Sequence, residues 1–316
     1  MIPIVYRWDD NQAPVLSGTK GSLIALLKAC LVDGYGDKLA AGWTMPYANA
    51  DESIACFRND HLEGNGIFLR VDETANANQA YLQCYETMTS HNDGHGKFFD
   101  ADTTVNLYKS NQASAASRGW LIAATKKIIY LAIWYDTGEP LSGANTVQGT
   151  LSVFGDYTRW PGTTHLNTIA SYSWGDWDHI QGLFPTYQFW GAGDGLIRTS
   201  RQMDGTLAPT NLIVGGTSGP CRGRSGRQNT YDFGVAYDGS YLMLLKPYIF
   251  QAGVNKNLGT LPGFYYHAHN CDDFTNLQEL THDGRTLTNL KFVHKNEKPI
   301  DRLNVNLFLE LGVDWG

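Results

Sequence analysis

The segment Trp120–Tyr135, WLIAATKKIIYLAIWY, contains two apolar runs on either side of Lys126 and Lys127. Each run has the length of a strand, and both are rich in β-branched and aromatic residues, which favour strands over a buried helix. The two lysines in the middle are suited to an exposed turn. The segment therefore predicts a hairpin of two buried strands.

Similar strand patterns lie on both sides of this hairpin. In residues 80–89, Leu82, Cys84 and Met88 alternate with polar side chains, which is the pattern of a half-buried strand. Near the end of the chain, Leu or Val occupies every second position from 303 to 311. The positions between them hold Asn304, Asn306, Phe308 and Glu310. This alternation predicts a sheet with one buried face. Strands are expected at 67–71, 80–89, 151–157, 231–237, 241–245, 286–294 and 302–311.

One amphipathic helix is expected over about residues 20–33. Its apolar residues recur at the spacing of one helix face, at Leu23, Leu26, Leu27, Cys30 and Leu31. Ser17 or Thr19 is suited to capping its start, and Asp33-Gly34 is suited to ending it. We expect the leucine face to pack on a sheet.

Composition supports a turn-rich β protein. The chain has 316 residues, of which 34 are glycine, 12% are aromatic and 17% are charged, whereas about 25% charged residues is usual. The predicted fold is mainly β, with antiparallel β-sandwich or barrel domains and one N-terminal helix packed on a sheet. The length predicts two domains, 1–160 and 161–316, with a loop-rich insertion over 161–228.

Charge and cysteine content limit the partners and the compartment. A formal net charge of −7 argues against nucleic acid, which needs a basic face. The sequence has no uncharged apolar run long enough to span a membrane, and its first ten residues do not resemble a secretory signal. The scattered cysteines at 30, 56, 84, 221 and 271 are typical of free thiols in a protein made in a reducing cytoplasm.

Two histidine pairs are weak candidates for a metal site. His91 and His95 lie four residues apart in HNDGHG, but the glycines exclude a helix of the HExxH type, and a solvated hairpin loop is the favoured alternative. His267 and His269 lie in HAHNCDD, where a strand would direct both rings to one side. A polar loop with ordinary hydrogen bonds is the alternative for this second pair.

Two other clusters are candidates for binding. Trp174, Asp176, Trp177 and Asp178 combine aromatic rings with carboxylates, a combination that suits glycan contact and, less readily, glycoside hydrolysis. Packing of the two tryptophans in a core or interface is the alternative. Arg222, Arg224 and Arg227 lie in a glycine-rich stretch and are candidates for contact with an acidic partner or with phosphate, or for a solvated loop.

The sequence contains no enzyme signature of useful specificity. There is no phosphate-binding loop, no GxGxxG before a helix and no GxSxG. We therefore expect a protein with no catalytic activity and no cofactor.

Several segments in order along the chain carry a resemblance to a known family. The longest is Ala13–Lys38, APVLSGTKGSLIALLKACLVDGYGDK, followed by AGWT from Ala41. Shorter ones are YETMT from Tyr85, WLIAA from Trp120, Tyr130-Leu131, FGD from Phe154 and LPGFYYH from Leu261. Together they resemble a family of tailed-bacteriophage virion structural proteins, whereas residues 160–220 fit poorly. The resemblance implies a particle component, and it transfers no catalytic residue.

The expected function is a structural role in a virion, in the tail, baseplate or tail fibre, through protein–protein contacts. Tyr, Trp and Arg are favoured in interfaces, whereas Lys and Glu are not, so low charge fits a chain that buries much of its outer surface. The expected partners are other virion proteins, further copies of the chain in a homo-oligomer, and a host surface glycan. The alternatives are a carbohydrate- or receptor-binding module, a head-decoration protein and a glycan hydrolase.

Overall fold

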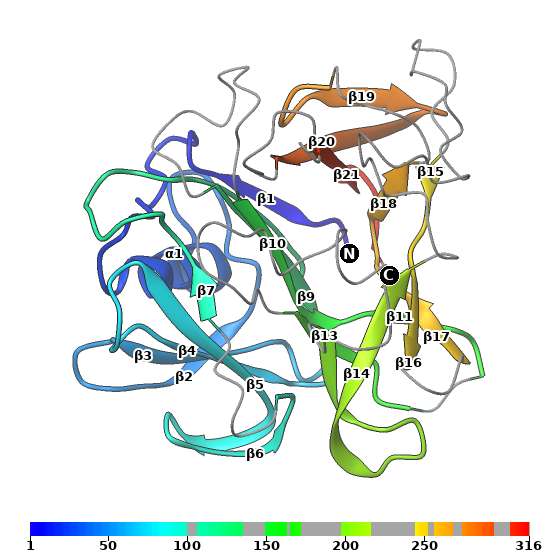
Figure 1. Cartoon of the computed structure of the whole chain (residues 1–316), viewed down its shortest axis with the longest axis horizontal. Coiled ribbons are helices and arrows are strands. Elements are labelled where there is room, and N and C mark those ends of the chain that lie inside the picture. The colour runs from blue at the N-terminus through cyan, green and yellow to red at the C-terminus, as the bar shows by residue number, and fades with distance from the viewer. Residues whose placement is uncertain are drawn as a thin grey trace, which may run out of the picture.

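The computed structural model describes residues 1–99, 106–134, 149–162, 165–171, 197–215, 244–251, 256–267, 274–293 and 304–315. Three antiparallel sheets and a short helical segment make up this part of the chain (Figure 1). The predicted mainly β class, with sandwich and barrel packing and a single N-terminal helix, is confirmed.

The largest sheet has ten strands. In spatial order they are β1 (Ile4–Arg7), β8 (Gly119–Ala124), β9 (Ile128–Trp134), β10 (Gly149–Asp156), β12 (Thr168–Ser171), β13 (Ile197–Arg201), β14 (Leu207–Gly215), β16 (Tyr248–Gln251), β17 (Lys256–Thr260) and β11 (Thr158–Arg159). The predicted hairpin is β8 and β9, which pair from Gly119 opposite Trp134 to Ala124 opposite Ile129. The prediction from the opening segment is confirmed.

The hairpin is buried on both of its faces. Ile122, Leu131 and neighbouring side chains belong to a core shared with the helix, whereas Tyr130 and Trp134 belong to a second core on the opposite face. Because successive side chains of a strand point to opposite faces, one apolar run supplies both cores. Figure 1 shows β9 and β10 passing between the sheet that contains β2 to β6 and the sheet that contains β18 to β21.

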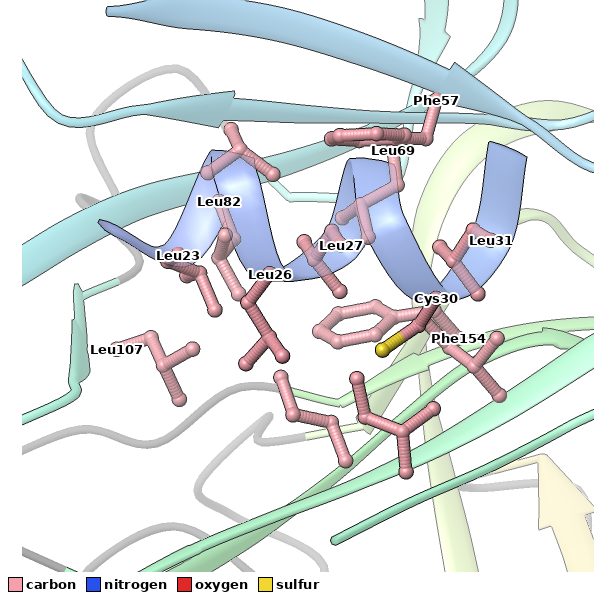
Figure 2. Close-up of a cluster of buried hydrophobic side chains, with 14 of the residues drawn as sticks. Leu23, Leu26, Leu27, Cys30, Leu31, Phe57, Leu69, Leu82, Leu107 and Phe154 are labelled. Carbon is pink, nitrogen blue, oxygen red and sulfur yellow. The ribbon is translucent and has the colours of Figure 1, made fainter. Parts of the chain in front are cut away.

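The first core lies between the hairpin and a six-stranded sheet, and the helix packs into the same core. That sheet consists of β2 (Thr44–Ala48), β3 (Ile54–Arg58), β4 (Phe68–Asp72), β5 (Gln79–Ser90) and β6 (Asp93–Lys97), with β7 (Asn106–Tyr108) paired to β5. Figure 2 shows the helix side chains Leu26, Leu27 and Cys30 directed into this core, with Phe154 beside Cys30, whereas Phe57 lies near Leu69 on another side of the helix. The predicted packing of the leucine face is confirmed.

The ends of the helix differ in part from the prediction. The α-helix α1 (Ser22–Lys28) continues as a π-helix, η1 (Ala29–Asp33), which ends at Gly34 with φ of +79° as expected for a glycine stop. The start has no side-chain cap from Ser17 or Thr19, because Gly21 occupies the capping position in a left-handed conformation. Instead, Glu73 reaches the helix from the β4–β5 connection and accepts a hydrogen bond from the Ile24 amide at 3.0 Å.

The second core lies between the hairpin and a five-stranded sheet. In spatial order this sheet consists of β15 (Leu244–Leu245), β18 (Phe264–His267), β21 (Asn304–Glu310), β20 (Arg285–Val293) and β19 (Glu279–His282). Trp134 stacks on Phe292 with ring centroids 5.8 Å apart and planes at 12°. Tyr130 stacks on Phe264 at 5.8 Å and donates a hydrogen bond to the Pro262 carbonyl at 2.9 Å.

The predicted pairing of the last two strands is confirmed, since β20 and β21 pair over seven residues. The prediction of one buried face is wrong. Phe308 and Glu310 alternate with Leu307 and Leu309, and all four are buried. Phe308 packs against Phe274 in a small core on the other side of the sheet, so both faces of β21 are covered.

Part of the ten-stranded sheet closes on itself. β11 follows β10 after the single residue Tyr157, yet β11 pairs with β17 at the far end of the sheet. The path from β10 through β12, β13, β14, β16 and β17 therefore returns to the same stretch of chain and forms a barrel. At this bend Gly155 has φ of +131°, and a Cβ there would lie 2.1 Å from the Lys127 carbonyl oxygen, so the position requires glycine.

The predicted domain division at residue 160 stays a prediction. Strands from both sides of that residue share the ten-stranded sheet, since β10 pairs with β12 from Phe154 opposite Ala170 to Asp156 opposite Thr168. The predicted hairpin around Asp238-Gly239 lies outside the described residues, except for Leu244 and Leu245 of β15.

A bidentate ion pair joins the six-stranded sheet to the barrel. Glu86 of β5 accepts hydrogen bonds from Arg201 of β13 at 2.6 Å from Nε and 2.7 Å from Nη2. The Ser200 hydroxyl donates to the same carboxylate at 2.6 Å. Paired hydrogen bonds between a guanidinium and a carboxylate are stronger than single neutral ones, so this contact fixes the two sheets relative to each other.

We expect Arg201→Met to lower the free energy of unfolding by about 1–2 kcal/mol, because the less exposed partner, Glu86, loses its cation. Denaturant unfolding measures this difference. Arg7→Met is the matched control, since Arg7 makes the same two-point contact at 2.8 and 2.7 Å with Asp9, whose side chain is 41% exposed against 14% for Glu86. The control should cost about 0.5 kcal/mol or less. Equal losses in the two variants would contradict the assigned role of Arg201.

Candidate functional site

A polar pocket lies where the β8–β9 turn meets the start of β11. Its volume is about 350 Å³. We call it the junction pocket. Its lining comprises Glu63, Gly64, Asn65, Thr125, Lys127, Ile128, Asp156, Tyr157, Thr158, Arg159, Asn167, Pro262 and Trp315. Segments far apart in the sequence therefore meet in one cavity.

Asp156 is the most deeply buried acidic residue of the junction pocket, with 6% of its surface exposed. It is the last residue of β10, and its backbone amide donates to the Lys127 carbonyl at 3.0 Å. The carboxylate accepts hydrogen bonds from the Asn65 amide at 2.7 Å and from the Asn59 side chain at 3.3 Å. Burial raises the pKa of Asp156, and the hydrogen bonds from Asn65 and Asn59 oppose that shift.

Hydrogen bonds also fix the other polar side chains of the junction pocket. The Asn65 side chain donates to the Asn167 side-chain oxygen at 3.0 Å, and Asn167 donates to the Tyr157 carbonyl. The Tyr157 hydroxyl is hydrogen-bonded to His165 Nε2 at 2.8 Å, and Arg159 donates to the His165 carbonyl at 3.1 Å. The side-chain amides of Asn65 and Asn167 therefore hold defined positions at the wall of the junction pocket.

The pH dependence of stability tests the environment of Asp156. Because its folded pKa is raised above the ordinary value of 3.8, the folded chain binds this proton more tightly than the unfolded chain. The resulting stabilisation is fully present below pH 3.8 and is lost as the pH rises through the folded pKa. We expect Asp156→Asn to remove this component, so that the stability difference between natural protein and variant shifts in favour of the variant as the pH rises.

Thermal unfolding of both proteins across the acidic range measures this difference. Asp204→Asn is the control, because Asp204 lies on the surface and hydrogen bonds from Thr206 lower its pKa. Its effect should have the opposite sign. A difference between the natural protein and Asp156→Asn that does not change with pH would contradict the assigned environment.

An aromatic strip lies on the outside of the barrel, beside the strands that close it. We use this name for Trp160, Tyr248 and Phe250. Trp160 and Tyr248 stack with centroids 6.1 Å apart, and Tyr248 meets Phe250 edge-on at 6.4 Å. Trp160 is 41% exposed and Tyr248 is 38% exposed. Ile249, which lies between Tyr248 and Phe250 on β16, points into the core. Tyr248 and Phe250 therefore lie on the outward face of β16.

The structure places His91 and His95 on the β5–β6 hairpin. The His91 carbonyl accepts a hydrogen bond from Arg70 at 2.7 Å, and its ring contacts the Asn92 side chain at 3.1 Å. His95 is exposed and lies opposite Thr87 in the ladder. Within the described ranges, no group of three or more His, Cys, Asp or Glu side chains is arranged to hold a metal ion.

The other predicted site residues lie largely outside the described residues. This applies to the candidate glycan contacts Trp174, Asp176, Trp177 and Asp178, and to the candidate partner contacts Arg222, Arg224 and Arg227. It also applies to His269. His267 ends β18, and only its backbone is described. These assignments stay predictions.

Sequence reasoning missed the junction pocket and the aromatic strip. The one available signal was Gly155-Asp156 at the end of an apolar strand, which indicated a turn but not a buried carboxyl group. Trp160 and Tyr248 are 88 positions apart in the sequence, and only the closure of the barrel brings them together. Cys30, Cys56 and Cys84 are buried free thiols, as expected from the sequence.

In comparisons with known proteins, no family model and no curated protein matched the sequence. The resemblance to virion structural proteins therefore rests on the sequence segments alone. None of the helices in the described part of the chain is long and apolar enough to cross a membrane.

Proposed function

We propose that the chain is a structural component of a tailed-bacteriophage virion, in the tail, baseplate or tail fibre, and that it acts by protein–protein contact. The aromatic strip is the observation that carries this proposal. Three adjacent aromatic side chains on the outside of a barrel, two of them more than one-third exposed, have the chemistry of an interface centre. The low charge content of the chain and the resemblance in its sequence support the same function.

The proposed contact joins the aromatic strip to another virion protein or to a second copy of the chain. Strand β16 presents Tyr248 and Phe250 from a sheet that is anchored on its other face by Ile249. A rigid strand lets aromatic side chains bind with little loss of conformational freedom. The strip is therefore suited to a permanent contact in a particle.

The test is incorporation of a variant into particles. We expect the double variant Trp160→Ser, Tyr248→Ser to be incorporated about tenfold less than the natural chain, because loss of a central interface aromatic commonly costs 2 kcal/mol or more. Leu62→Ser is the control, since Leu62 is 83% exposed and lies on the 60–63 turn. Incorporation of the double variant at the natural copy number would contradict a role for the strip.

A further inference from the structure

The size of the junction pocket suits a small molecule. Its volume of about 350 Å³ is at the lower end of the range of roughly 300–1,000 Å³ found for small-molecule sites. Its lining includes Asp156 and Asn167, which are held in place by the hydrogen bonds to Asn65. A wall that is already ordered loses little entropy when a ligand binds.

The charges around the junction pocket balance one another. Glu63 and Asp156 supply two acidic groups, and Lys127 and Arg159 supply two basic groups. An anion would meet the two carboxyl groups, and a cation would meet the two basic groups. The lining therefore favours a neutral ligand over a charged one.

The remaining lining provides both hydrogen-bonding groups and apolar surface. Asn65 and Asn167 use part of their amide groups in hydrogen bonds to each other and to the Tyr157 carbonyl. The Asn65 side-chain oxygen and the second lone pair of the Asn167 oxygen leave acceptors for the hydroxyl groups of a polyol. Tyr157, Pro262 and Trp315 add apolar surface that suits the C–H groups of a sugar ring. We propose that the junction pocket binds a neutral polyhydroxylated molecule of the size of a monosaccharide. This inference goes beyond the proposed virion role and does not depend on it.

Titration of the purified full chain with glucose, galactose, mannose and N-acetylglucosamine, followed by ligand-observed NMR, tests the proposal. We expect at least one of these sugars to bind with a Kd of about 1–10 mM, and inorganic phosphate and ammonium to bind more weakly than that sugar. Failure of all four sugars to bind would overturn the proposal. Tighter binding of phosphate or ammonium would overturn the preference for a neutral ligand.

Two variants locate the binding in the junction pocket. Thr158→Trp fills the cavity from an exposed position on β11, and Asn65→Ala removes one amide while keeping the backbone N–H that holds Asp156. We expect about tenfold weaker sugar binding in the first variant and a smaller loss in the second. Asn76→Ala, an exposed asparagine on the β4–β5 connection, should bind as the natural chain does. Unchanged affinity in Thr158→Trp with an unchanged melting temperature would overturn the location.

Discussion

Lys109→Met is expected to lower the free energy of unfolding by about 3–5 kcal/mol, because it leaves the carboxylate of Glu73 buried without a cation. Both side chains are fully buried, and Lys109 Nζ contacts the Glu73 carboxylate directly. Lys109 also donates to the Thr19 carbonyl and to the Ser22 hydroxyl, the latter at 2.9 Å. The substitution therefore removes the partner of three polar groups around the start of the helix.

Glu73 itself links this ion pair to the helix. Its second carboxylate oxygen accepts from the Ile24 amide at 3.0 Å, which satisfies one of the free N–H groups at the start of α1 and lies at the positive end of the helix dipole. Burial lowers the pKa of Lys109, and the attraction of Glu73 opposes that shift. The pair thus ties the start of α1 to the ends of β4 and β7 in the six-stranded sheet.

Denaturant unfolding measures the loss, with two controls. Lys28→Met removes a lysine of α1 itself, whose pairing with Glu52 is on the surface, and should cost about 1 kcal/mol or less. The double variant Glu73→Gln, Lys109→Met should recover part of the loss, since it leaves no buried charge. A loss in Lys109→Met no larger than in Lys28→Met would contradict the structural role of the pair.

Trp134→Ala is expected to lower the free energy of unfolding by about 3–5 kcal/mol, because it opens a large cavity between two sheets. The Trp134 ring is almost fully buried, stacks on Phe292 and meets Trp8 edge-on at 6.2 Å. Its indole N–H also donates to the Lys291 carbonyl at 3.2 Å. The substitution removes a principal contact between β9 and the five-stranded sheet.

Thermal and denaturant unfolding of the same variant measure this cost. Trp160→Ala is the matched control, because it removes the same side chain from an exposed position and should cost about 1 kcal/mol or less. Equal losses at the two positions would show that the hairpin does not pack against the five-stranded sheet as described.

The main β elements and the helix were predictable because their signals are local. The apolar runs of Trp120–Tyr135 correspond to β8 and β9, and the leucine spacing after Leu23 corresponds to α1. In both cases burial follows directly from the periodicity of apolar side chains. The alternation in residues 80–89 matches β5 at Leu82 and Cys84, which belong to the first core, whereas Met88 packs in a separate cluster with Cys56 and Phe68.

The contacts between distant segments were not predictable from such signals. Glu73 replaces the expected serine or threonine cap from 49 positions away, and no local pattern marks it. The barrel closes through β11, which has only two residues. The second buried face of β21 depends on Phe274, a residue that does not belong to the strand.

The candidate sites in the structure, like these contacts, depend on residues from distant segments. The aromatic strip combines residues from two segments, and the junction pocket combines at least four, so neither forms a motif in the sequence. The predicted tryptophan–aspartate and arginine clusters are compact in sequence and lie in segments outside the described residues. Glycan contact at Trp174 and partner contact at Arg222 therefore remain predictions alongside the sites found in the structure.

Mass spectrometry of gradient-purified particles of the phage that is proposed to encode the chain tests the proposed virion role most directly. We expect peptides of the chain in a fixed ratio to the major particle proteins, retained after a salt wash that removes adsorbed host proteins. Absence of the chain from infectious particles, with abundant chain in the lysate, would contradict the proposed function.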